Sequence, residues 1–179
     1  PDPGVLIRKW GELKKDIFGI SVANAGDVNK DGIDDIVVGA YLWDKPVTVN
    51  GKPKKLKSIG RVYVYSGRDG SELFAASPLT GERSNDWFGY SVAGADINGD
   101  GYADIIVGAP RADITASTTV NGKTKVKVLK RDTGKVYVFS GKTGDLIASV
   151  QGAAVGDNLG FVVAKAGRVD ADANDDVVI

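Results

Sequence analysis

The sequence predicts an all-β fold, part of a β-propeller made of four-stranded antiparallel blades. The first observation is an internal repeat, because segments 18–41, 88–110 and 159–179 share one pattern at intervals of roughly 70 residues. The second is the number of turns that 24 glycines spread along the chain would allow. The third is that no long stretch has the periodicity of an amphipathic helix. Repeated groups of short strands are typical of propeller blades.

Each repeat is expected to contain four strands. In the first repeat, residues 20–25 are short and rich in small side chains, and residues 36–40 form the continuous apolar run of a strand buried on both faces. Residues 61–65 alternate in the period-two pattern of a strand. After a turn at 66–70, residues 72–76 are expected to be the fourth strand. Insertions between the second and third strands make this blade longer than the roughly 40–45 residues of a common four-stranded repeat.

The whole chain, 1–179, is predicted to be part of one propeller domain. Because propellers usually close with four to eight blades, the ring requires further blades or copies of this chain. The predicted parts are an outer strand of a preceding blade (5–10), one blade (18–77), a second blade (88–150) and the inner strands of another (159–179).

Composition excludes several classes of function. The chain has no histidine and no cysteine, so it cannot use Ser-His-Asp or Cys-His catalysis, and it has neither disulfides nor His- or Cys-ligated zinc. Its 23 Lys and Arg residues equal its 23 Asp and Glu residues, which gives no general attraction to nucleic acid. No apolar run approaches the roughly 18–20 residues that span a bilayer, so no membrane span is expected.

Two loops between the first and second strands carry oxygen ligands at the same spacing. Side-chain oxygens occupy loop positions 1, 3, 5 and 9, a glycine at position 6 allows a sharp turn, and the carbonyl of position 7 completes the set. Hard oxygen ligands in this number suit Ca²⁺, so two calcium sites are expected. The predicted ligands are Asp27, Asn29, Asp31, Ile33 and Asp35 in the first loop, and Asp96, Asn98, Asp100, Tyr102 and Asp104 in the second.

Other interpretations of these loops remain open. Asp- and Gly-rich turns can simply be solvated, and Mg²⁺ is an alternative that prefers an octahedral shell with several waters. Pairs of carboxylates also serve glycoside hydrolysis. The recurrence of the same aspartates in every repeat argues against catalysis, because an active site would normally occur once.

The third loop departs from the ligand pattern. Arg168 stands at position 1 and Ala173 replaces the glycine of position 6, while Asp170, Asp172 and Asp176 remain. A guanidinium at position 1 places positive charge where the first carboxylate should bind the ion. We therefore expect Arg168 to pair with the three remaining aspartates, and this loop to bind calcium weakly or not at all.

The repeats resemble the FG-GAP repeats of integrin alpha-chain heads. Phe18-Gly19 with residues 39–41, and Phe88-Gly89 with residues 108–110, match the FG and GAP signatures, and the Asp loop lies between them. The resemblance implies a propeller with calcium between the first two strands of a blade, and a role in binding extracellular partners. Similar repeats occur in secreted bacterial proteins, some beside carbohydrate-active domains. Leu159, Tyr41 and Arg168 depart from the pattern.

The insertions at 41–60 and 109–133 are predicted to be basic hairpins on the face opposite the Asp loops. They form either a binding face for an anionic partner or solvated hairpins whose lysines discourage strand pairing between molecules. Trp43 could stack on a sugar or pack under its hairpin. The residues of this candidate partner face are Trp43, Lys52, Lys54, Lys55, Lys123, Lys125 and Lys127.

These features predict a non-enzymatic, calcium-stabilised binding or adhesion module for an extracellular protein or an acidic polysaccharide. Extracellular modules bind calcium at roughly 10⁻⁴–10⁻³ M, which places this one outside the cell or on its surface. One alternative is the propeller of a carbohydrate-active enzyme such as a polysaccharide lyase, with Glu82, Arg83 and Asp86 as a single, non-repeated polar cluster. Another is a structural piece that assembles into a ring.

Overall fold

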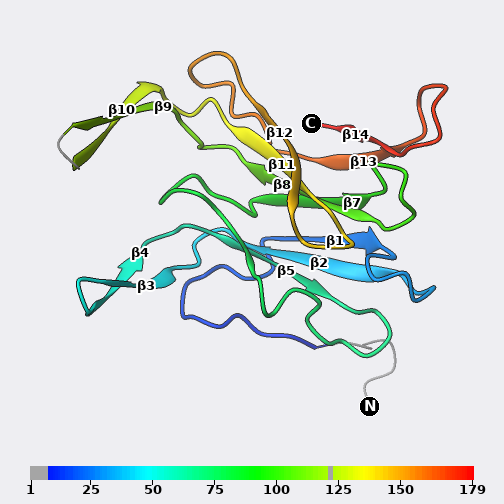
Figure 1. Cartoon of the computed structure of the whole chain (residues 1–179). Helices are drawn as coiled ribbons and strands as arrows, with labels where there is room; N and C mark the ends of the chain where they lie inside the picture. Colours follow the sequence, from blue (N-terminus) through cyan, green and yellow to red (C-terminus); the bar gives the residue numbers. More distant parts are fainter. Residues whose placement is uncertain (1–7, 121–122) are drawn as a thin grey trace.

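The computed structural model describes residues 8–120 and 123–179, and its regular elements are all β-strands. Three antiparallel sheets lie side by side, with the inner strands β1, β7 and β13 next to one another (Figure 1). The described sheets do not close into a ring. This arrangement is a partial β-propeller, as the sequence predicts. No described segment is a helix long and apolar enough to cross a membrane.

The first blade has the strand order β1-β2-β5-β6. Its strands are β1 (Ser21–Gly26), β2 (Asp35–Ala40), β5 (Arg61–Tyr65) and β6 (Leu79–Thr80). The prediction of a fourth strand at 72–76 is wrong. Glu72 forms an isolated bridge with Tyr65, after which the chain turns at 73–76, and pairing with β5 resumes at β6. In this turn, Leu73 and Phe74 pack against the buried core.

The second blade has the strand order β12-β11-β8-β7. Its strands are β7 (Ser91–Ala95), β8 (Asp104–Ala109), β11 (Lys135–Phe139) and β12 (Leu146–Gln151). Two further strands, β13 (Ala164–Gly167) and β14 (Asp176–Val178), pair with each other beside β7. Of the outer strand predicted at 5–10, residues 8–10 lie in no strand and residues 5–7 lie outside the described part.

Both insertions form hairpins. They are β3 (Lys45–Val49) with β4 (Lys52–Leu56), and β9 (Ile114–Val120) with β10 (Lys123–Lys130). At the first tip, Asn50 and Gly51 have φ of 51° and 72°, the positive values that a two-residue type I′ turn requires. The tip at 121–122 lies outside the described residues. Figure 1 shows the hairpins at one end of the sheets and the β1–β2, β7–β8 and β13–β14 loops at the other.

The main core lies between the first and second blades. Val37 and Val64 of the first blade belong to the same buried cluster as Phe88, Ile105 and Val107 of the second. The Phe88 ring is fully buried and meets Tyr137 and Phe139 edge-on, at centroid distances of 5.4 and 5.9 Å. Apolar residues therefore cover both faces of an inner sheet, which explains the continuous apolar runs of β2 and β8.

The glycines of the FG and GAP signatures form the contact between neighbouring blades. Gly89 and Gly160 have φ of 85° and 86°, which side chains on L-residues rarely allow. A Cβ on Gly39 would overlap the carbonyl oxygen of Gly89, and a Cβ on Gly108 would overlap that of Gly160. The Ser21 hydroxyl also donates to the Gly89 carbonyl at 3.0 Å. The two signatures are thus the two sides of one backbone contact between blades.

Candidate metal-binding loops and the opposite face

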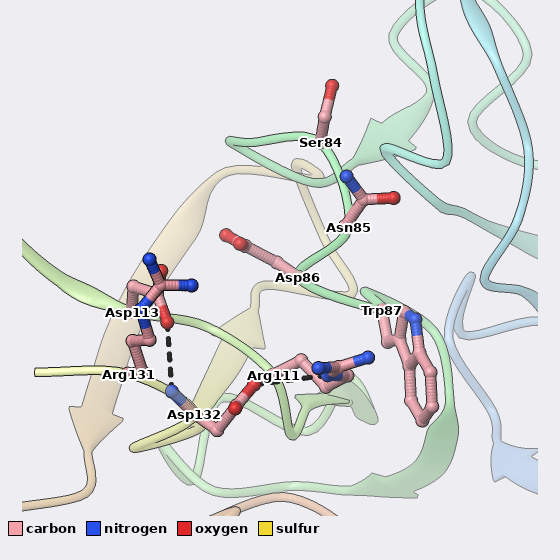
Figure 2. A pocket seen from close by; sticks show the side chains of 8 residues that line it. All are labelled: Ser84, Asn85, Asp86, Trp87, Arg111, Asp113, Arg131 and Asp132. Atoms are coloured by element: carbon pink, nitrogen blue, oxygen red, sulfur yellow. Dashed lines mark hydrogen bonds and ion pairs between the residues drawn. The ribbon is translucent and has the colours of Figure 1, made fainter. Parts of the chain in front are cut away.

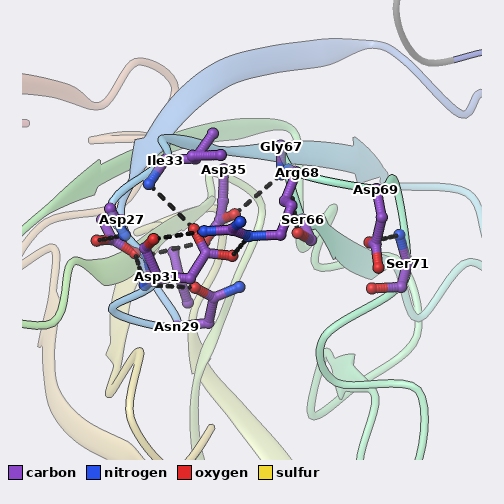
Figure 3. A network of polar contacts seen from close by, with 12 residues as sticks. Asp27, Asn29, Asp31, Ile33, Asp35, Ser66, Gly67, Arg68, Asp69 and Ser71 are labelled. Atoms are coloured by element: carbon purple, nitrogen blue, oxygen red, sulfur yellow. Dashed lines mark hydrogen bonds and ion pairs between the residues drawn. The ribbon is translucent and has the colours of Figure 1, made fainter.

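The 27–35 loop folds its polar side chains toward its own backbone (Figure 3). The amide of Asp31 donates to Asp27 Oδ1 at 2.9 Å and to Asn29 Oδ1 at 3.0 Å. Because both oxygens accept from one nitrogen, the side chains of positions 1 and 3 lie on the same side of the loop. Asp27 Oδ2 also accepts from the Gly32 amide at 2.8 Å, which closes the turn around position 6.

The 96–104 loop has the same local geometry. Asp96 accepts from the amides of Gly99 at 2.8 Å and Gly101 at 2.9 Å, and Asn98 Oδ1 accepts from the Asp100 amide at 2.9 Å. The Asp100 carboxylate in turn accepts from the Tyr102 amide at 3.0 Å. Equal spacing in sequence therefore produces similar placement of the first three predicted ligands, with one difference: Asp27 Oδ1 accepts from the amide of position 5 and Asp96 Oδ1 from that of position 4.

The aspartate of position 9 anchors each loop to its blade. Asp35 is buried and accepts from the amides of Val28 at 2.9 Å and Gly67 at 3.0 Å. Asp104 is fully buried and accepts from Gly141 in the matching turn of the second blade. Burial raises the pKa of both carboxyls, against the effect of these hydrogen bonds.

The donor set of both loops fits calcium chemically. Three carboxylates, one amide oxygen and one carbonyl are hard oxygen donors of the kind that Ca²⁺ takes, and a bidentate carboxylate or water would complete its shell of roughly six to eight oxygens. As they lie, no group of three or more acidic side chains in the described residues is arranged to hold a metal ion. Their oxygens instead accept hydrogen bonds from loop amides. The calcium sites stay a prediction that depends on donor identity and spacing.

The third loop keeps its turns without the first carboxylate. Asp170 and Asp176 accept hydrogen bonds from loop amides as their counterparts do. The expected pairing of Arg168 is not present, since in the described chain its guanidinium forms no ion pair with Asp170, Asp172 or Asp176.

A different aspartate of this loop carries the ion pair. Asp175 binds Lys165 at 2.6 Å, and this hydrogen bond lowers the pKa of Asp175. Asp175 stands at position 8, which the ligand pattern had left unassigned. Lys165 of β13 is its main counter-charge, and the more distant charge of Arg168 acts in the same direction.

Backbone hydrogen bonds join each loop to the next. The amide of Ala103 donates to the Asp27 carbonyl at 3.0 Å, and that of Asp175 donates to the Asp96 carbonyl at 2.9 Å. In both cases position 8 of one loop binds position 1 of the preceding loop. Sequence patterns could not show this contact, because it involves only main-chain atoms.

Comparison with known proteins decides the family. The model of the FG-GAP repeat matches residues 18–65 and 88–139, and that of an FG-GAP-like repeat matches 47–107. The chain belongs to the FG-GAP repeat family. It is 31% identical to Integrin alpha-V of Gallus gallus over 164 residues, which are 90% of this chain and 13% of that protein.

Further integrin alpha chains are similar to this FG-GAP chain. Integrin alpha-5 of Xenopus laevis is 35% identical over 75% of the chain, and Integrin alpha pat-2 of Caenorhabditis elegans is 34% identical over 94% of it. The chain spans only 11% and 13% of the lengths of these two proteins. The similarity therefore concerns the repeats and leaves most of each relative unmatched.

On the opposite face of the FG-GAP chain, the hairpin lysines are exposed but Trp43 is not. Trp43 is 7% exposed, and its Nε1 donates to Glu12 Oε2 at 3.1 Å. It packs beneath its hairpin, so it offers no ring for sugar stacking and the stacking interpretation is wrong. Among the lysines predicted for the partner face, Lys52, Lys54 and Lys55 on β4 and Lys125 and Lys127 on β10 are exposed, while the side chain of Lys123 lies outside the described part.

Two residues of the polar cluster considered for catalysis, Glu82 and Asp86, have counterparts in the first repeat, whereas Arg83 is matched by Leu13. Glu82 pairs with Lys135 at 2.8 Å, and the equivalent Glu12 pairs with Arg61 at 2.7 Å. Asp16 likewise occupies the position equivalent to Asp86, two residues before the FG phenylalanine. Each glutamate ties the segment before a blade to the start of its third strand. The repetition of the two acidic residues indicates a structural role for them.

Asp86 nevertheless lies beside a hollow of about 380 Å³ on the hairpin side (Figure 2). Arg111 crosses the hollow, binding Asp132 at 3.0 Å and lying over the Trp87 ring at 4.9 Å. The Asp86 carboxylate is buried and accepts no hydrogen bond within the described chain. Burial raises the pKa of Asp86 to about 7, and the neighbouring carboxylate of Asp113 adds to this effect.

Asp86 should make the FG-GAP chain more stable at mildly acidic pH. Its raised pKa stabilises the folded state fully below the ordinary aspartate pKa of about 4, and this contribution is lost as pH rises to about 7. Replacing Asp86 with asparagine should therefore raise the free energy of unfolding at pH 8 by roughly 1–2 kcal/mol and flatten its dependence on pH. Thermal unfolding from pH 5 to 8 at fixed calcium measures both, with the exposed Asp145→Asn variant as control. An unchanged pH profile would contradict the assignment.

Proposed function

We propose that this FG-GAP chain is part of a calcium-stabilised β-propeller that acts outside the cell as a non-enzymatic binding module. The observation that carries the proposal is the pair of loops 27–35 and 96–104. They have identical donor types at five positions, the same turn geometry and a buried anchoring aspartate. A solvated turn does not need to repeat all three features.

Calcium would have a structural role. Asp27, Asn29, Asp31, the Ile33 carbonyl and Asp35 would hold one ion, and the equivalent residues of the second loop another. The bound ion would supply positive charge that offsets the repulsion among three carboxylates. The Ala103 amide and the Asp27 carbonyl form a hydrogen bond between the two loops. An ion that orders one loop would therefore also stabilise the loop of the neighbouring blade.

The partner is proposed to bind on the hairpin face. The exposed lysines of β4 and β10 lie at the end of the sheets opposite the calcium loops, and basic hairpins favour an extracellular protein with an acidic surface or an acidic polysaccharide. Similarity to integrin alpha chains supports a binding role on the cell surface. Hairpins that are merely solvated would show no such binding.

Calcium dependence of stability tests this proposal. Saturating calcium should raise the melting temperature of the chain by roughly 5 °C or more relative to a chelator, because a ligand that binds only the folded state stabilises it. The combined Asp31→Ala and Asp100→Ala changes should abolish this rise, and Asp145→Ala, an exposed aspartate outside the loops, should preserve it. Equal melting temperatures in calcium and chelator would refute the calcium role.

A further inference from the structure

Arg68 binds the first loop at the residue that should be a central calcium ligand (Figure 3). The arginine belongs to the turn at 66–70 that follows β5. Its Nε lies 3.1 Å from Asp31 Oδ2, and its Nη2 donates to the Asp31 carbonyl at 2.6 Å. A single guanidinium thus holds both the side chain and the main chain of loop position 5.

The second loop has no equivalent contact. Lys142 occupies the position of Arg68 in the matching turn, but its Nζ lies 5.3 Å from the centroid of the Tyr102 ring. In the described chain it forms no ion pair with Asp100. Lys30 from the neighbouring loop lies over the same ring at 4.9 Å and reaches only the Asp100 carbonyl, at 3.5 Å.

The residue at loop position 7 explains the difference. Tyr102 offers an aromatic face on which two ammonium groups lie, away from the Asp100 carboxylate. The first loop has Ile33 at this position, which provides no such face. The planar guanidinium of Arg68 can donate to a carboxylate and a carbonyl at once, and here it binds Asp31.

We infer that Arg68 makes the two loops unequal, so that calcium binds the 96–104 loop more tightly than the 27–35 loop. This inference rests on the proposed calcium function. The donor types are the same in both loops, so a difference in affinity must come from their surroundings. In the first loop, a fixed positive charge lies on a ligand oxygen and must be displaced or tolerated when a divalent cation binds. Arginine stays charged at any working pH, so this weakening of calcium binding should not depend on pH through Arg68.

Calorimetric titration of calcium into the chain separates the two loops. Asp100→Ala leaves only the first loop, and Asp31→Ala leaves only the second. We expect the first loop to bind roughly three- to tenfold more weakly, the size of effect that a partly exposed charge should have. Adding Arg68→Ala to the Asp100→Ala chain should raise the calcium affinity of the first loop by the same three- to tenfold. Lys142→Ala in the Asp31→Ala chain is the matched control and should change affinity little.

Arg68→Ala in the otherwise unchanged chain provides a second measurement, which needs no ligand substitution. The dissociation constants of the two loops should become more similar in this variant. Equal affinities that Arg68→Ala does not alter, or a weaker first loop after that change, would overturn the inference and leave the calcium function intact. An absence of calcium binding to either loop would overturn the calcium function itself, and the inference with it.

Discussion

Replacing Gly39 with alanine should lower the free energy of unfolding by about 3 kcal/mol, the upper end of the range for forcing extra atoms into a closely packed site. The added methyl group would overlap the carbonyl of Gly89 in the next blade and the hydroxyl of Ser21 in its own. The carbonyl belongs to the backbone, so it cannot move aside as a flexible side chain would. The blades would have to separate, and denaturant unfolding would detect the loss.

A second glycine change distinguishes this clash from the general effect of alanine. Gly51 at the first hairpin tip has a positive φ but open space around the position of a Cβ. Gly51→Ala should therefore cost only about 1 kcal/mol, the strain of a left-handed residue. If Gly39→Ala were no more destabilising than Gly51→Ala, the glycine contact would not hold the blades together.

Truncating Phe88 to alanine should cost about 3–5 kcal/mol, the range for a large ring removed from a core. Phe88 is fully buried between two blades, and Tyr137 and Phe139 contact its ring edge-on. The space left between two packed sheets cannot close without moving a whole blade. Chemical denaturation of the variant and the unchanged chain gives the difference directly.

The chain itself supplies the matched control for Phe88. The third repeat has Leu159 at the equivalent position, where it packs against the cluster of Ile106 and Val163. Phe88→Leu should therefore cost less than about 1.5 kcal/mol, because it keeps an apolar side chain of related size. A leucine variant as unstable as the alanine variant would show that the aromatic contacts, and not filled volume, dominate at this site.

The features that could be predicted from sequence are those that depend on local pattern. Strands β2 and β8 appear as apolar runs because both of their faces are covered, and Asn50-Gly51 specifies its turn through local conformational preference. The fourth strand of the first blade could not be placed in this way. Its position depends on where Leu73 and Phe74 pack, and that depends on the neighbouring blade.

The candidate site divides in the same manner. The types and spacing of the predicted ligands can be read from the sequence, and so can the replacement of a carboxylate by Arg168. The contact of Arg68 with Asp31 joins residues from two separate turns, and the hydrogen bond of Trp43 to Glu12 joins residues 31 positions apart. Neither contact follows a periodic pattern, so only the assembled structure shows them.

The number of calcium ions bound per chain tests the central claim most directly. Equilibrium dialysis at millimolar calcium should give two ions per chain, one for Asp31→Ala, one for Asp100→Ala and none when both changes are combined. The 168–176 loop should contribute none, because Arg168 replaces its first carboxylate. A count of zero for the unchanged chain would contradict the calcium account, and a third ion held by Asp170, Asp172 and Asp176 would contradict the reasoning about Arg168.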